Sequence, residues 1–147
     1  MNTTTTNGTN GANTIVPAIG RLLLATIFIF SALGKLAAPA ATIGYIASSG
    51  LPFAPLAYAA AIAIELGGGL LLVFGWQTRI VAAFMAAFSI VTALAFHHAF
   101  GDQNQLLHFL KNIAIAGGML QVAAFGAGAY SIDARAGRTN RPAQFAA

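Results

Sequence analysis

Ionisable side chains inside long apolar stretches are the residues of this sequence best suited to chemistry. Glu65 lies in the middle of one such stretch, and Lys111 lies near the start of another. A charged side chain at the centre of a membrane helix costs about 2.5 to 3.5 kcal/mol, so it usually has a function or an oppositely charged partner. We therefore take Glu65 and Lys111 as candidate catalytic residues, which handle protons or contact a ligand headgroup.

Other polar side chains belong to the same apolar stretches or their ends, and most gather with Lys111 at the expected outer end. Histidine, lysine and asparagine donate hydrogen bonds to carbonyl oxygens, and a quinone presents two carbonyl oxygens on a headgroup with an apolar tail. The sequence thus indicates a quinone as the candidate cofactor, with no intrinsic cofactor of the chain's own. The candidate ligand-binding residues are Arg21, Lys35, His97, His98, His108 and Asn112.

Alternative interpretations of these residues stay open. A buried Glu65 must be paired or protonated, and an ion pair that only fixes helix packing explains it as well as a ligand does. Its available partners are Arg21, Lys35, His98 and Lys111. Lysine and histidine at helix ends also extend to the membrane surface without binding anything. A metal or haem site would need more ligands than the three histidines, three acids and absent cysteines supply, so we predict no metal.

The composition identifies the solvent in which these residues must be positioned. Of the 147 residues, 58% are hydrophobic and only 7% are charged, and the mean hydropathy is +0.77. Ordinary soluble domains are about 25% charged, so the expected surroundings are a lipid bilayer. The seven Lys and Arg residues are too sparse to line a face that neutralises several phosphates, so no nucleic-acid partner is expected.

Long apolar runs with very few charges locate the membrane spans, because a bilayer core of roughly 30 Å requires about 20 apolar residues of helix. The sequence predicts spans at Ile15 to Ala37, Leu56 to Phe74, Arg79 to Phe96 and Leu106 to Phe125. The fold class is therefore all-α, an integral membrane four-helix bundle over residues 15–130. Residues 1–14 are expected to be a disordered tail, and residues 131–147 a polar tail.

Spacing predicts how the first span faces its neighbours. Arg21, Ala25, Phe28, Ala32 and Lys35 follow one another at steps of three and four, so they share one helix face. That face is expected to point into the bundle. The segment between the first two spans contains SSGLPFAP, whose prolines and glycine predict a short interfacial or re-entrant segment.

The distribution of arginine predicts the orientation. Arginines concentrate in the turn after the second span and in the C-terminal segment, and cytoplasmic loops carry an excess of Lys and Arg. Both termini of a multi-pass protein are therefore expected in the cytoplasm. The residues concerned are Arg79, Arg135, Arg138 and Arg141.

Taken in combination, several motifs resemble the DoxX family of small four-helix membrane proteins, in particular its bacterial inner-membrane branch. The matching stretches extend over almost everything from Gly20 to Asp133. The residues at positions of the family pattern are Arg21, Gly34, Lys35, Glu65, Gly68, Arg79, Lys111 and Asn112. The stretches are RLLLATIFIFSALGKL, SSGLP, ELGGGLLLVFGWQTR, FHHAF, FLKNIAIAGG and GAGAYSID.

The resemblance implies a bacterial inner-membrane protein associated with quinone-linked oxidoreductase complexes. Membrane oxidoreductase subunits and a second copy of the chain are the implied protein partners. A non-catalytic membrane adaptor is the alternative, since glycine-rich helix faces can serve packing alone. A small-solute or proton transporter is a further alternative, although the sequence shows neither internal repeats nor the broken helices of many carriers.

Overall fold

The computed structural model of the protein describes residues 12–139, which form helices and the segments that connect them. Four membrane-length apolar stretches occur in the described part: Ile15–Ala37, Ala54–Phe74, Thr78–Phe96 and Gln103–Phe125. The predicted all-α fold with four membrane-length helices is therefore confirmed. The elements are α1 (Ala12–Ala37), α2 (Pro39–Ser48), α3 (Ala54–Ile62), the π-helical turn η1 (Ala63–Gly67), α4 (Gly68–Phe74), α5 (Thr78–Phe96), α6 (Gln103–Phe125) and α7 (Ile132–Thr139).

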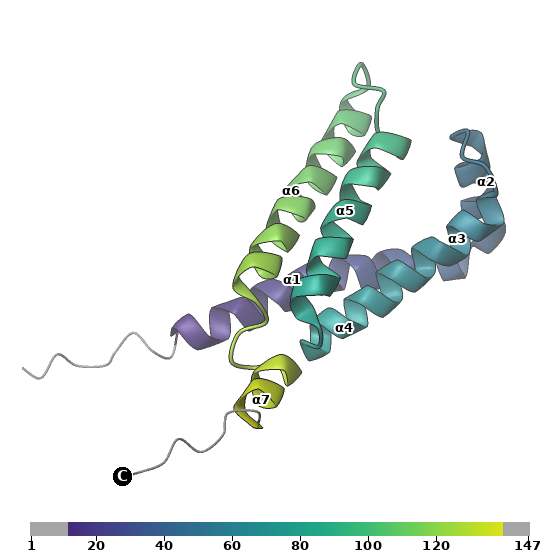
Figure 1. Ribbon diagram of the computed structural model, residues 1–147. Coiled ribbons are helices and arrows are strands. Elements are labelled where there is room, and N and C mark those ends of the chain that lie inside the picture. Colours follow the sequence, from purple (N-terminus) through teal and green to yellow (C-terminus); the bar gives the residue numbers. More distant parts are fainter. Residues whose placement is uncertain (1–11, 140–147) are drawn as a thin grey trace, which may run out of the picture.

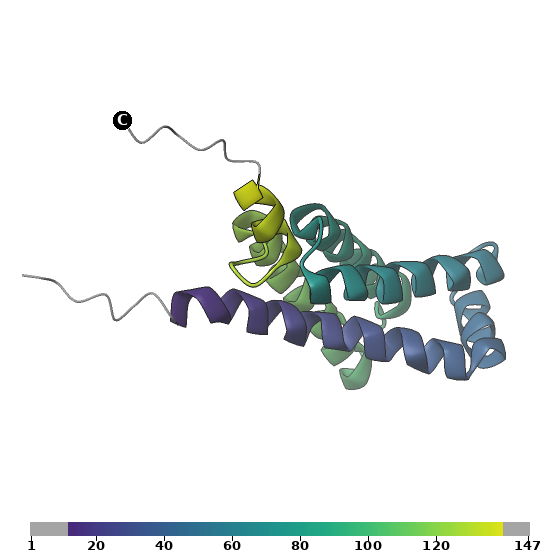
Figure 2. The same cartoon turned by 90° about the horizontal axis from the view of Figure 1, so that it is seen from below.

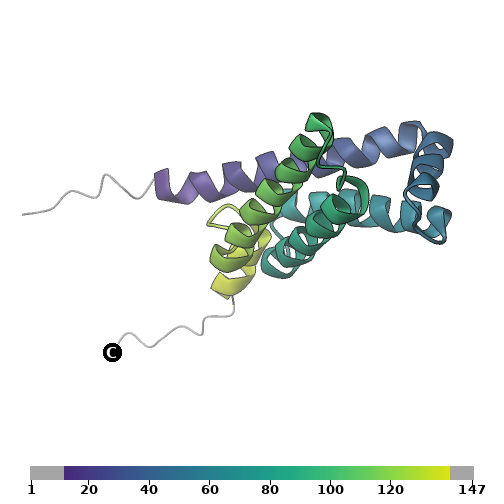
Figure 3. The ribbon, with the colours of Figure 1, turned by 90° about the horizontal axis from the view of Figure 1, so that it is seen from above.

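The four long helices form two antiparallel hairpins. Helix α1 pairs with the continuous span made of α3, η1 and α4, and the two lie side by side in Figure 2. Helices α5 and α6 form the second hairpin, which is steeply inclined to the first in Figures 1 and 3. The connection between α5 and α6 lies at the end of the second hairpin away from α7 (Figure 1).

Small side chains allow the hairpins to pack closely where they cross. Ala25 of α1, Leu72 of α4 and Met119 of α6 are fully buried in one core cluster. A Cβ at Gly69 would lie 2.7 Å from Cγ1 of Ile29, so only glycine permits this approach of α4 to α1. Arg21, Ala25, Phe28 and Ala32 are buried and Lys35 is half-buried, which confirms the inward face predicted for the first span.

The segment between the first two spans contains a ten-residue helix, α2, that connects the far ends of α1 and α3. Pro39 begins α2, since proline fits a first helical turn. Gly50 supplies the positive φ of the turn that follows. The ring of Tyr45 stacks on Phe96 of α5, with ring centroids 5.5 Å apart. The predicted short segment is therefore a helix that reaches from the first hairpin to the second.

The opposite end of the protein is held together by Arg21. Its guanidinium is buried and donates to the backbone carbonyl of Ala127 at 2.6 Å, that of Tyr130 at 2.9 Å and that of Val73 at 3.4 Å. The same end contains the tight turn at Gly75, where φ is +67°. Arg21 thus ties α1 to the end of α4 and to the loop after α6.

Residues 131–147, expected to be a polar tail, include the helix α7, which packs against this end. The Asp133 carboxylate accepts hydrogen bonds from the backbone N–H groups of Gln77 and Thr78, each at 2.9 Å, and so caps α5 from a distant part of the chain. The backbone N–H of Asp133 also donates to the carbonyl of Gly75. Residues 1–11 of the expected N-terminal tail and 140–147, with Arg141, lie outside the described residues, and α1 begins at Ala12.

The surroundings of Asp133 favour its charged form. Burial alone would raise its pKa, but hydrogen bonds from Thr78 and Gln77 and the nearby charge of Arg21 together hold the pKa below its ordinary value. A pKa that is lower in the folded state contributes stability that is complete above the unfolded value, about 3.9, and is lost as the pH falls through the folded value.

Asp133→Ala is therefore expected to lower the free energy of unfolding by about 1 to 2 kcal/mol at neutral pH, because α5 loses its cap. The difference from the parent should be smaller at an acidic pH below about 3.9, because this stability is lost as the pH falls through the lowered pKa of the parent's carboxylate. Unfolding by sodium dodecyl sulfate, followed by circular dichroism at both pH values, measures the two differences. A difference of the same size at both pH values would contradict this account of the cap.

Candidate functional site

A cavity of about 450 Å³ lies between the two hairpins, in the half of the protein away from α7. This volume falls within the range of about 300 to 1,000 Å³ typical of small-molecule sites. Its walls are mainly apolar, with polar side chains from α1, α2, η1, α5, the segment after α5 and α6. The polar or charged lining residues are Ser31, Lys35, Thr42, Tyr45, Glu65, Thr92, His97, Lys111 and Asn112.

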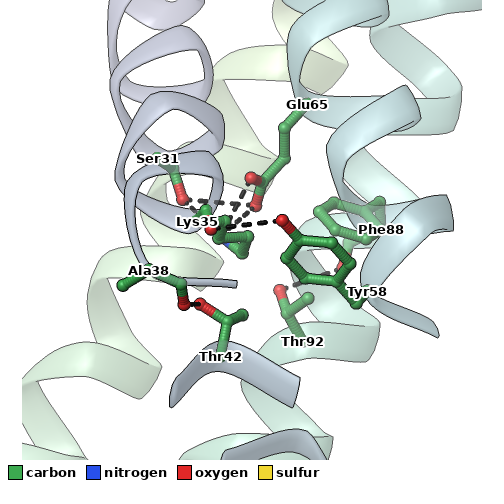
Figure 4. A network of polar contacts seen from close by, with 8 residues as sticks. All are labelled: Ser31, Lys35, Ala38, Thr42, Tyr58, Glu65, Phe88 and Thr92. Atoms are coloured by element: carbon green, nitrogen blue, oxygen red, sulfur yellow. Dashed lines mark hydrogen bonds and ion pairs between the residues drawn. The ribbon is translucent and has the colours of Figure 1, made fainter. Parts of the chain in front are cut away.

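Lys35 and Glu65 form an ion pair on the cavity wall (Figure 4). The Lys35 Nζ atom lies 2.9 Å from each carboxylate oxygen of Glu65 and 2.7 Å from the hydroxyl oxygen of Ser31. The Glu65 side chain is 7% exposed and that of Lys35 is 25% exposed. An ammonium has three N–H bonds, and all three are used here. Of the partners that the sequence left open for Glu65, the structure selects Lys35.

Glu65 lies in the middle of the π-helical turn η1, which interrupts the α-helical hydrogen bonding of the second span. Single π turns inside α-helices are rare and occur frequently at functional sites. Periodicity of apolar residues did not reveal this turn, because it changes the helix register by only one residue. Its consequence is local: the carboxylate lies opposite α1, within reach of Lys35 and Ser31.

Lys111 and Asn112 supply the wall of the cavity with hydrogen-bonding groups that remain free for a ligand. The Lys111 Nζ atom lies 2.9 Å from Nδ1 of His108, which uses one of its three N–H bonds. The Asn112 amide nitrogen donates to the backbone carbonyl of His108 at 3.1 Å. Its second N–H and its side-chain carbonyl oxygen have no hydrogen-bond partner among the described residues.

Two histidines lie beside these groups at the outer end of α5 and α6. The rings of His97 and His108 stack with centroids 5.1 Å apart, and Nδ1 of His97 lies 3.0 Å from Oε1 of Gln105. That oxygen only accepts, so Nδ1 of His97 is the donor in this contact. His97 lines the cavity, whereas His108 lies behind it and contacts Lys111.

The structure brings together most of the residues predicted from the sequence and separates others. The cavity is lined by Glu65, Lys111, Lys35, His97 and Asn112. His98 is exposed on the turn after α5, and neither it nor His108 lines the cavity. Arg21, also predicted to bind the ligand, does not line the cavity, and its guanidinium donates to backbone carbonyls at the other end of the protein.

Sequence reasoning missed the contribution of α2 and of two hydroxyl groups. Tyr45 and Thr42 of α2 line the cavity, and Ser31 shares the ammonium of Lys35. The spacing of Ser31, four residues before Lys35, was a signal that places both side chains on one helix face. The hydroxyl of Tyr58 donates to the backbone carbonyl of Lys35 at 3.3 Å and fixes the end of α1 (Figure 4).

This arrangement suits the binding of an amphipathic molecule with oxygen acceptors on its headgroup. Lys111 and Asn112 present donors, Glu65 presents a carboxylate, and apolar side chains such as Phe28, Phe88 and Ile115 provide the remaining wall. Among the described residues no group of three or more His, Asp or Glu side chains is placed to hold a metal ion. The groups on the cavity wall can therefore donate hydrogen bonds, accept them and exchange a proton.

Comparison with known proteins identifies the family. The DoxX family profile matches residues 16–98. Inner membrane protein YqjF of Escherichia coli (strain K12) is 41% identical over 117 residues, which cover 78% of this chain and 87% of that protein. Inner membrane protein YphA of the same strain is 33% identical over 140 residues, covering 92% of this chain and all of YphA. No solved structure gives a significant match. The chain belongs to the DoxX family.

Proposed function

We propose that the protein is a quinone-binding subunit of an oxidoreductase in the bacterial inner membrane, and that the cavity between the hairpins holds the quinone headgroup. One observation carries the proposal: the donors of Lys111 and Asn112 share a mainly apolar cavity with the carboxylate of Glu65. When bound, a quinone supplies the capacity to carry electrons and protons. The names of the two E. coli relatives support the inner membrane as the location.

Each polar residue of the cavity then has a role that follows from its contacts. Lys111 and Asn112 hold the carbonyl oxygens of the headgroup through their remaining N–H bonds. Glu65 holds or releases a proton at its carboxylate oxygens. Lys35 acts through Glu65 as a positioning residue, because its three N–H bonds are already used by Glu65 and Ser31.

The orientation that we propose places both termini in the cytoplasm and the cavity in the outer half of the membrane. Arg79 and Arg135 are exposed at the end of the protein that contains α7, and Trp76 beside them is 53% exposed, as expected for a side chain at headgroup level. Fusion of alkaline phosphatase to the C-terminus tests this orientation, since the enzyme stays inactive in the cytoplasm.

Filling the cavity tests the proposed quinone site. Ala61→Phe places a ring in the cavity, whereas Ala59→Phe adds the same ring to an exposed position of the same helix. Titration of the purified protein in nanodiscs with a short-chain quinone should show binding to the parent and to Ala59→Phe, and none to Ala61→Phe. Asn112→Leu should weaken binding about tenfold, because a buried acceptor of the ligand loses its donor.

The proposal fails if the parent binds no quinone, or if Ala61→Phe binds it as tightly as Ala59→Phe does. Mass spectrometry of the protein extracted gently from its native membrane then decides what replaces it. A retained partner protein without any quinone would favour the non-catalytic adaptor.

A further inference from the structure

All acidic side chains of the protein are already engaged with partners other than Lys111. The chain has three acidic residues. Glu65 binds Lys35, Asp102 accepts from the backbone N–H of Gln105 and caps α6, and Asp133 caps α5. Lys111 therefore has no side-chain carboxylate within residues 12–139, and its described contact is the neutral nitrogen Nδ1 of His108.

The position of Lys111 makes this lack of a counter-charge costly. It lies eight residues after Gln103, the first residue of α6, and so about 12 Å along the helix from its start. Helix α6 has 23 residues, about 34 Å, so when it spans a bilayer core of roughly 30 Å this position falls within the hydrocarbon region, where an unpaired ammonium is unfavourable. The lysines among the cavity-lining residues are Lys35 and Lys111, while Glu65 is the acidic one, so the wall carries one excess positive charge.

An anionic ligand would supply the missing charge. We propose that the cavity prefers a quinone whose headgroup is deprotonated and anionic, as in an acidic hydroxyquinone, and that Lys111 confers this preference. The inference rests on the proposed quinone site and narrows its ligand class. An ammonium and an oxygen anion form a charge-assisted hydrogen bond, which is shorter and about twice as strong as a neutral one. His108, which accepts from Lys111, leaves the other N–H bonds of the ammonium for that oxygen.

Two probes that differ mainly in charge test this preference. A 2-hydroxy-3-alkyl-1,4-naphthoquinone is ionised at neutral pH, and its 2-methoxy analogue is neutral with nearly the same shape. Equilibrium binding of both is measured to the full-length protein in nanodiscs made of uncharged lipid. The parent should bind the anionic probe about tenfold more tightly than the neutral one.

The variants assign the preference to the charge at position 111. Lys111→Met should bind both probes with similar affinity, Lys111→Arg should keep the preference, and Arg135→Gln should keep it as well. Arg135 is exposed on α7 outside the cavity, so this control removes one positive charge without touching the site. Circular dichroism in the same nanodiscs confirms that each variant is folded.

The possible failures are distinguishable. If neither probe binds the parent, the proposed quinone site and this inference both fail. If both probes bind the parent equally, or if Lys111→Met retains the preference, the quinone site stands and only the role of Lys111 is overturned. A preference lost equally in Arg135→Gln would trace it to net charge and would also overturn the inference.

Discussion

Lys35→Met is expected to lower the free energy of unfolding by about 3 to 5 kcal/mol, the typical cost of removing one partner of a buried ion pair. Glu65 would remain 7% exposed in its side chain, with the hydroxyl of Ser31 at 3.3 Å as its remaining hydrogen-bond donor. The cost arises because the carboxylate keeps its desolvation penalty and loses two hydrogen bonds from the ammonium. Unfolding in sodium dodecyl sulfate, followed by circular dichroism, measures the loss.

A second substitution separates the unpaired charge from the lost packing. Lys35→Met with Glu65→Leu leaves no charge behind, so the double variant should recover most of the stability that the single variant loses. Lys111→Met is the matched control, since this lysine has no carboxylate partner and is exposed. Its substitution leaves no carboxylate unpaired and removes an ammonium that lacks a counter-charge, so it should not lower the free energy of unfolding. Equal unfolding of Lys35→Met and the parent would mean that the pair contributes nothing to the fold.

The helices of this protein were predictable because each helix that spans a lipid bilayer needs a run of about 20 mainly apolar residues. The predicted ends at Ala37, Phe74, Phe96 and Phe125 agree with the structure. Glycine or histidine follows three of these residues, and an apolar run visibly stops there. The starts at Ala54, Thr78 and Gln103 come one to three residues earlier than predicted, because the first helical turns contain proline and polar residues that hydropathy alone excludes.

The candidate site was predictable as a set of residues but not as a set of contacts. Rare ionisable groups at membrane depth identified Glu65, Lys35 and Lys111, which all line the cavity. Whether Glu65 pairs with Lys35 or with Lys111 depends on how the two hairpins cross and on the π turn around Glu65, and neither leaves a periodic signal. Periodicity placed Arg21 on the same face as Lys35, yet about 20 Å of helix separates the two residues.

The contacts of Asp133 and Arg21, at the opposite end of the protein, could not be predicted from the sequence either. A polar segment rich in arginine resembles a solvated tail, and a sequence reveals only local caps such as that of Asp102 on α6. Asp133 caps a helix that begins 55 residues earlier in the chain, so the partner becomes visible only in three dimensions. The packing of α7 explains why a polar segment after the last span is helical.

Arg21→Leu is expected to lower the free energy of unfolding by about 3 kcal/mol or more. The guanidinium donates one buried hydrogen bond, to the carbonyl of Ala127, and two part-buried ones, to the carbonyls of Val73 and Tyr130. A buried acceptor left without a donor costs about 1 to 3 kcal/mol, and the part-buried acceptors add less. Arg21→Lys should lose less stability, because an ammonium keeps the positive charge. It should still lose some, because an ammonium lacks the planar fork that reaches separate carbonyls. Arg79→Leu is the matched control, since Arg79 is exposed at the same end and its loss should cost about 0.5 kcal/mol at most.

Arg21→Leu should also loosen the loop before α7 under conditions in which the rest of the protein stays folded. The loop that carries Ala127 and Tyr130 leads directly into α7, so its release should expose the peptide bond after Arg135 to trypsin under native conditions. The parent and Arg79→Leu should be cleaved slowly at that bond and Arg21→Leu rapidly. If cleavage stays slow while global stability falls, Arg21 supports the crossing of the long helices rather than the docking of α7. If neither changes, the three carbonyls do not depend on Arg21, and the account of this end of the protein is wrong.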